Sequence, residues 1–233
     1  MTVETVAKRI FTQTEQRKPL DISFFHIVWL FLLCSFIGLV GEVIVSFFTD
    51  GRLESRAGFV IGPFSPLYGL GAVLITLALN PIRDRNVIAQ FAVGALVGGV
   101  LEYFTGWFLE TRYGIVAWSY IDQPFNFHGH TCLSMMALWG IIGIAWVWIA
   151  LPLAVKLVER IPVEIRKPLT AVAFVFIMAD SVLTLACLDS WFWRTAGYPI
   201  ENPIQQFCAT YFGDEFMRTR FETMGMWTVL ASR

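Results

Sequence analysis

The sequence has few charged residues. Asp, Glu, Lys and Arg make up 15% of its 233 positions, whereas soluble domains carry about 25%. Five stretches contain none of these residues, namely 22–41, 57–82, 86–101, 123–155 and 168–179. A helix needs roughly 20 predominantly apolar residues to cross a bilayer. The scarcity of charge therefore excludes an ordinary soluble domain and predicts an all-α, multi-pass helical membrane protein.

The sequence also lacks the motifs of common nucleotide-binding and hydrolytic enzymes. It contains no GxxxxGK[ST], GxSxG or HExxH pattern, so we expect no cofactor in this chain and ATP only through a separate ATPase subunit, if any. Enzyme activity stays open, with a non-enzymatic role favoured. The net charge of −1 and the absence of a basic aromatic patch give no indication of a nucleic-acid partner.

Cysteines are few and none is part of a CxxC pair. They are Cys34, Cys132, Cys187 and Cys208, of which the first and third fall inside predicted spans. This spacing argues against a disulfide framework or a zinc site. We expect the four to be small buried apolar side chains.

The apolar stretches predict about five transmembrane helices, at 24–48, 58–80, 87–109, 130–153 and 168–190, within a membrane domain spanning 23–190. When the C-terminal tail is left out of the count, the segments on one side carry ten Lys and Arg and those on the other carry three, which places the N-terminus in the cytoplasm. No cleaved signal peptide is expected. Residues 1–22 are predicted to form a cytoplasmic amphipathic segment, and 191–233 a polar and aromatic tail on the outer side.

Two segments sixty residues apart share their plan. The gap-free alignment pairs Phe31, Gly38, Val40, Glu42, Phe48 and Arg52 with Phe91, Gly98, Val100, Glu102, Phe108 and Arg112. We interpret this as two hairpin repeats, at about 24–80 and 87–153, that run in the same direction. The two glutamates would then lie at equal depth, nearer the outer face.

Three carboxylates interrupt the apolar spans: Glu42, Glu102 and Asp180. An acid inside a bilayer costs several kcal/mol unless it faces a protein interior or a wet cavity, so each is a candidate functional residue. Arg52 and Arg112, ten residues further on, are the candidate partners of the glutamates. The alternative is that both glutamates lie at a water-filled outer rim. Asp180 has no counterpart in the repeat and is a candidate proton or cation relay.

Segment 58–71 cannot be an undisturbed helix, because it combines several glycines with Pro63 and Pro66. Non-helical backbone at membrane depth lines a cavity or is buried in protein. One interpretation is a broken or re-entrant start of the second span, whose exposed amides and carbonyls would suit a ligand or an ion, with Tyr68 as a further candidate contact. The other is an ordinary helix that begins at Pro66.

The loop before the fourth span contains polar and aromatic residues, among them Trp118, Tyr120, Asn126, His128 and His130. Two histidines and nearby acids could suggest a metal, but two ligands do not define a site, and none is predicted. We treat these residues as candidate solute contacts.

The chain resembles the bacterial family of CmpB-type membrane proteins, described as ABC-transporter type IV permeases. The resemblance runs from about residue 30 to 224. It rests on Gly38-x-x-x-Glu42, Gly51-Arg-Leu-x-x-Arg56, Gly62-Pro-x-x-Pro-x-Tyr-Gly69, Glu102, Glu110, Trp118-x-Tyr120, Asn126-x-x-Gly129, Asp180 and the tail from Asp214 to Met224. Ser119 and His130 depart from the family pattern, which has an acid and a basic residue there.

The resemblance implies a multi-pass subunit in the bacterial plasma membrane. Its partners would be the lipid bilayer, a possible P-loop ATPase, and further copies or a second membrane subunit. Our leading hypothesis is a permease-like subunit that binds a small polar or ionic solute in an outward cavity. Glu42, Glu102, Arg52 and Arg112 would line that cavity, with Arg56 nearby and 62–71 at its floor. The alternatives are an intramembrane enzyme using Glu and His as acid and base, and a scaffold or sensor that transports nothing.

Overall fold

The computed structural model describes residues 18–222, so most of the predicted amphipathic segment 1–22 and the end of the tail lie outside the described residues. The structure is 71% helical with almost no sheet, which confirms the predicted all-α class. Its elements are α2 (Phe24–Asp50), α3 (Pro66–Leu79), η1 (Asn80–Ile82), α4 (Val87–Tyr113), β1 (Asn126–Phe127), β2 (Thr131–Cys132), α5 (Leu133–Ala145), η2 (Trp146–Ala150), α6 (Leu151–Val158), α7 (Val163–Thr195), α8 (Pro203–Tyr211) and α9 (Asp214–Arg220).

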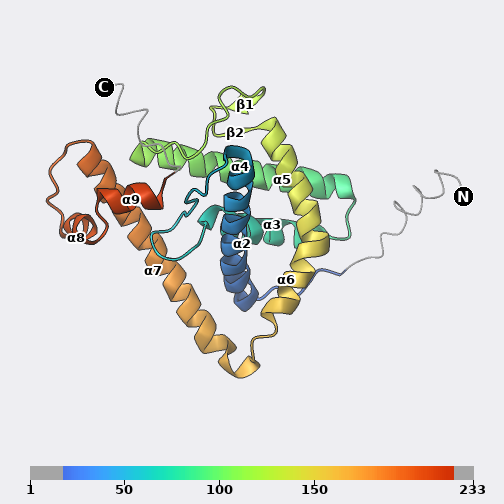
Figure 1. Cartoon of the computed structure of the whole chain (residues 1–233). Helices are drawn as coiled ribbons and strands as arrows, with labels where there is room; N and C mark the ends of the chain where they lie inside the picture. Colours follow the sequence, from blue (N-terminus) through green and yellow to red (C-terminus); the bar gives the residue numbers. More distant parts are fainter. Residues whose placement is uncertain (1–17, 223–233) are drawn as a thin grey trace, which may run out of the picture.

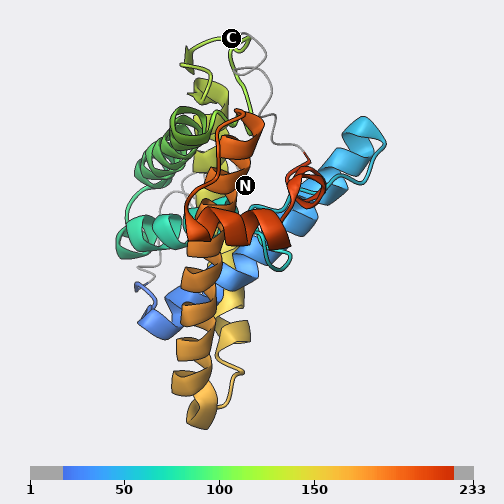
Figure 2. The same cartoon turned by 90° about the vertical axis from the view of Figure 1, so that its left-hand side faces the viewer.

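The long helices form an open frame. In Figure 1 the α5–α6 arm and α7 converge at the bottom, where the turn 159–162 joins them, and α4 crosses the top of the frame. Helices α2 and α3 lie between the two arms, and α8 and α9 pack beside the upper part of α7. Figure 2 shows the C-terminal end of α2 and the loop after it extending away from the other helices.

Within residues 18–222, four helices are long and apolar enough to cross a membrane: Phe24–Thr49, Val87–Tyr113, Leu133–Val158 and Val163–Thr195. They confirm a multi-pass helical membrane protein. The second predicted span, 58–80, is wrong at its start, because the helix begins only at Pro66 and the apolar helical stretch Pro66–Ile82 is shorter than the other four. Proline lacks an N–H and has a fixed φ that suits the first helical position, whereas Gly62 at φ +72° interrupts the chain before it.

The helix that continues from α5 into α6 widens at residues 146–150 into a π-helix. Pro152 has no N–H to donate to the carbonyl four residues earlier, so the regular bonding pattern cannot continue there. The two tryptophans of this turn then tie neighbouring helices together. Trp146 Nε1 donates to Thr76 Oγ1 and Trp148 Nε1 to Gln90 Oε1, each at 2.7 Å.

The hairpins α2–α3 and α4–α5 make corresponding glycine contacts. A Cβ at Gly38 would lie 2.3 Å from Cγ of Tyr68, and a Cβ at Gly98 would lie 2.2 Å from Cγ of Trp139. The residue after Tyr68 on α3 and the residue after Trp139 on α5 are both glycines, and they also make corresponding contacts. A Cβ at Gly69 would lie 2.8 Å from the carbonyl oxygen of Phe31, and a Cβ at Gly140 would lie 2.8 Å from that of Phe91. This correspondence supports the two-hairpin repeat, which stays a prediction.

Candidate functional site

The non-helical segment 58–65 is held by side chains from distant parts of the chain. From α7, Asp180 Oδ1 accepts from the amide of Ile61 at 3.1 Å, and Thr184 Oγ1 accepts from the amide of Val60 at 2.9 Å. From α9, Arg220 donates to the carbonyl oxygens of Phe59 (2.7 Å) and Gly62. Backbone groups that a helix would bond internally are thereby satisfied by protein, as membrane depth requires.

Asp180 is at the centre of this arrangement, with 2% of its surface exposed. Its second oxygen, Oδ2, has no hydrogen-bond partner among the described residues. Arg220 lies close enough for electrostatic attraction. Burial lowers the pKa of Arg220, and the nearby Asp180 carboxylate opposes that shift. The predicted relay residue is therefore also a structural clamp on segment 58–65.

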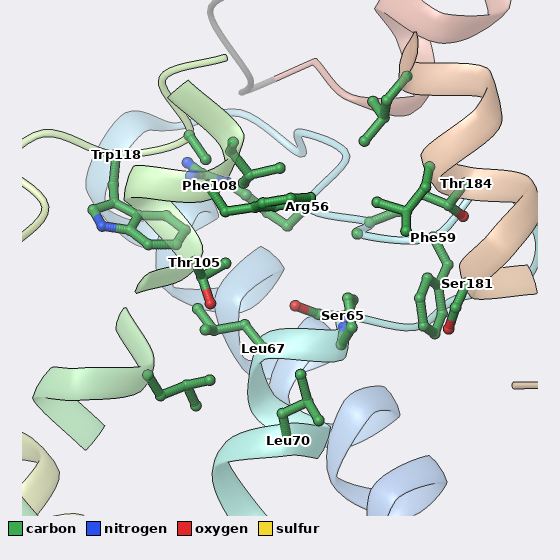
Figure 3. A pocket seen from close by; sticks show the side chains of 18 of the residues that line it. Arg56, Phe59, Ser65, Leu67, Leu70, Thr105, Phe108, Trp118, Ser181 and Thr184 are labelled. Atoms are coloured by element: carbon green, nitrogen blue, oxygen red, sulfur yellow. The ribbon is translucent and has the colours of Figure 1, made fainter. Parts of the chain in front are cut away.

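A cavity of about 430 Å³ lies against this segment. Figure 3 shows Leu67 and Leu70 of α3 on one side, Thr105 and Phe108 of α4 on another, and Ser181 and Thr184 of α7 opposite, with Trp118, Phe59, Ser65 and Arg56 completing the wall. Most of the lining side chains are apolar. Charge enters the wall only through Glu42 and Arg56, among the described residues that line the cavity.

Glu42 and Arg56 form a polar corner of the cavity. Their side chains approach to 3.8 Å, and Tyr68 is hydrogen-bonded to Glu42. Arg56 also donates to Ser46 Oγ and to Glu54 Oε2, each at 3.1 Å. The partner of Glu42 is thus Arg56 and not the predicted Arg52.

Three other predicted contacts belong to the loop after α2 or to segment 58–65 and the start of α3. Arg52 is exposed in the loop after α2, and Pro63 is exposed in segment 58–65. Pro66, as the first residue of α3, does line the cavity.

Glu102 occupies a separate buried site. It accepts hydrogen bonds from the hydroxyl of Tyr120 at 2.9 Å and from Thr131 Oγ1 at 2.7 Å. Burial, and then the Glu102 carboxylate, raise the pKa of Tyr120, which keeps that hydroxyl protonated as a donor. The predicted partner Arg112 instead pairs with Asp189 at 2.5 Å. Glu102 and Arg112 are not among the residues that line the cavity.

The loop between α4 and α5 has internal bonds that fix its shape. Trp118 Nε1 donates to the carbonyl oxygen of His130 at 2.8 Å, which orients the indole that closes one side of the cavity. Asn126 Nδ2 donates to the carbonyls of Ile121 and Gln123, and Asn126 Oδ1 accepts from the amide of Gly129. Asn126 therefore acts within the loop.

The two histidines of this loop face other residues than the candidate carboxylates. His128 Nδ1 lies 3.1 Å from the hydroxyl of Tyr103, and His130 Nε2 lies 3.4 Å from Glu110. Within residues 18–222 no group of three potential metal ligands occurs. The geometry gives the acid–base pairing of Glu42 or Glu102 with a histidine no support.

Several partners were not identified from the sequence. Thr184 stands four residues after Asp180 on the same helix, a spacing that puts both on one face and could have drawn attention to it. Arg220, Asp189 and Thr131 carry no such local signal, because their partners lie far away along the chain.

Comparison with known proteins identifies one family. A family model described as "Putative ABC-transporter type IV" matches residues 29–185, which is more than half of the chain. No curated protein and no solved structure matches the chain.

Proposed function

Because the chain belongs to the family described as putative ABC-transporter type IV, we propose that it is a permease-like subunit whose cavity binds the transported solute. Membership of this family and four long apolar helices support a role in membrane transport. The observation that carries the finer proposal is the cavity of about 430 Å³ beside the non-helical segment 58–65. Broken helical backbone of this kind forms the solute sites of many transporters.

The cavity favours a solute with an apolar body and one cationic or hydrogen-bond-donating group. Its walls offer aromatic surface from Phe59, Phe108 and Trp118, and leucines add aliphatic surface. At the polar corner, two carboxylates face one guanidinium, and the 3.8 Å contact of Arg56 with Glu42 is longer than its 3.1 Å contact with Glu54. A cationic group could therefore replace Arg56 at Glu42 while Arg56 keeps Glu54. The sequence suggested any small polar or ionic solute, whereas the cavity favours one that is largely apolar and carries a single cationic or donor group.

Asp180 remains a proposed relay. Its Oδ2 atom has no hydrogen-bond partner among the described residues, and Ser181 and Thr184 of the same helix line the cavity. Both observations support the transient binding of a proton or a cation by Asp180. The proposed setting is the bacterial plasma membrane with a cytoplasmic N-terminus.

A photoreactive alkyl amine carrying a diazirine tests the solute site in nanodiscs. We expect it to label peptides of the cavity wall. Glu42→Gln should reduce this labelling at least about tenfold, because the loss of a charge-assisted hydrogen bond costs roughly 1.5–3 kcal/mol. Mass spectrometry of the labelled peptides is the measurement.

Glu110→Gln is the matched control, because Glu110 lies on α4, pairs with His130 and does not line the cavity. It should leave the labelling unchanged. Labelling spread evenly over lipid-facing positions, or unaffected by Glu42→Gln, would show that the cavity is not the site.

Transport driven by ATP would require a separate ATPase subunit bound to this chain. Purification in a gentle detergent should recover a P-loop ATPase in fixed stoichiometry, together with further copies of this chain or a second membrane subunit. The turn 159–162 between α6 and α7 is the proposed contact on the cytoplasmic side. Arg160→Glu, at an exposed position of that turn, should reduce ATPase recovery at least about threefold, a loss of about 0.7 kcal/mol.

The exposed Arg52, in the loop after α2, supplies the control for this experiment. Arg52→Glu makes the same charge change on the proposed outer side and should leave recovery unchanged. A clean homo-oligomer without any ATPase would overturn ATP coupling and leave the solute site to be judged by the labelling experiment.

A further inference from the structure

Two cysteines from different helices meet inside the protein. Cys187 of α7 and Cys208 of α8 are each 1% exposed, and their Sγ atoms lie 3.3 Å apart. The other two cysteines have different surroundings. Cys132 Sγ lies 3.1 Å from Ser134 Oγ, and Cys34 is half-buried in α2.

Hydrogen bonds between α7 and α8 hold the two sulfurs in contact. Ser190 Oγ of α7 donates to the carbonyl oxygen of Gln205 at 2.8 Å, and Gln205 Nε2 donates to Asp189 Oδ2 at 2.8 Å. The cysteines belong to a buried cluster that includes Trp191 and Met217. Because a disulfide bond is 2.03–2.05 Å long, the sulfurs need to approach by only about 1.2 Å.

We propose that Cys187 and Cys208 form a disulfide bond that attaches the tail to α7. In this reaction each thiol loses its proton, the sulfurs join, and two electrons pass to the disulfide of a thiol–disulfide oxidoreductase, which becomes a dithiol. Such oxidants act on the extracytoplasmic side of bacterial membranes, where a cytoplasmic N-terminus followed by the five spans predicted from the sequence would place the tail. The bond would also hold α9, and with it Arg220, against segment 58–65 of the cavity wall.

Counting thiols tests the bond. Membranes are quenched in acid and denatured in detergent, and free thiols are labelled with a polyethylene-glycol maleimide before or after reduction. With four cysteines in the chain, we expect two additions without reductant and four after reduction. Four additions without reductant would overturn the proposal.

Variants assign the pair, and they need not fold, because the assay reads denatured chains. Cys187→Ser and Cys208→Ser should each give three additions under both conditions, since each frees the remaining partner. Cys34→Ser should give one addition before reduction and three after it. Three additions under both conditions for Cys34→Ser would place Cys34 in the bond and refute the assignment.

Discussion

Replacing Asp180 by Leu is expected to destabilise the protein by about 1–3 kcal/mol, the cost of leaving a hydrogen-bond donor inside the protein without its acceptor. The amide of Ile61 would lose its acceptor, and the guanidinium of Arg220 would lose the electrostatic attraction of a nearby carboxylate. For a chain of this size, such a loss corresponds to a fall in Tm of roughly 2–12 °C. Thermal unfolding in detergent, followed by the loss of the monodisperse chromatographic peak, measures it.

Two further variants distinguish the clamping role of Asp180 from its relay role. Asp214→Asn removes a half-exposed carboxylate that pairs with Arg194 at 2.7 Å, and it should cost no more than about 1 kcal/mol. If Asp180→Leu is no worse than this control, Asp180 does not stabilise segment 58–65. Asp180→Asn keeps an oxygen for Ile61 and should cost less than Leu. Loss of transport in a stable Asp180→Asn protein would support the relay.

The class of the fold follows from the sequence because lipid imposes a strict rule. A segment without charge that is about 20 residues long has few soluble alternatives, and four of the five predicted spans are helices of sufficient length. The remaining one, the second predicted span at 58–80, is wrong at its beginning, and the reason is again local. Gly62 and Pro66 stop a helix from extending back to residue 58, yet hydropathy counts that apolar stretch as part of the span.

The sequence predicts the carboxylates of the site but not the residues that pair with them. Carboxylates inside apolar spans identify Glu42, Glu102 and Asp180 without any structure, because their burial needs a physical reason. Their partners follow from the path of the chain and not from spacing. The loop after α2 turns back to bring Arg56 to Glu42, while Glu102 is reached by Tyr120 from the loop after α4.

Alanine at Gly98 is expected to cost about 1–3 kcal/mol through overpacking. The new methyl group would lie 2.4 Å from Cβ of Trp139, an atom attached to the backbone of α5, so the helices must separate. At Gly41, by contrast, a Cβ meets nothing within 4 Å. There alanine should stabilise α2 by about 0.5–1 kcal/mol, because glycine is the poorer helix former. Thermal unfolding of both variants gives opposite shifts in Tm if this packing is correct.

Gly38→Ala extends this comparison to the first hairpin. A Cβ there would lie 2.4 Å from Cβ of Tyr68, as the one at Gly98 does from Cβ of Trp139. Two hairpins built on one plan should therefore lose similar stability when either glycine gains a methyl group. A large loss at Gly98 with none at Gly38 would contradict the equivalence and leave α2–α3 free to move against each other. Since Tyr68 also bonds Glu42 of the cavity corner, the same variant should disturb amine labelling, whereas Gly98→Ala should act through stability alone.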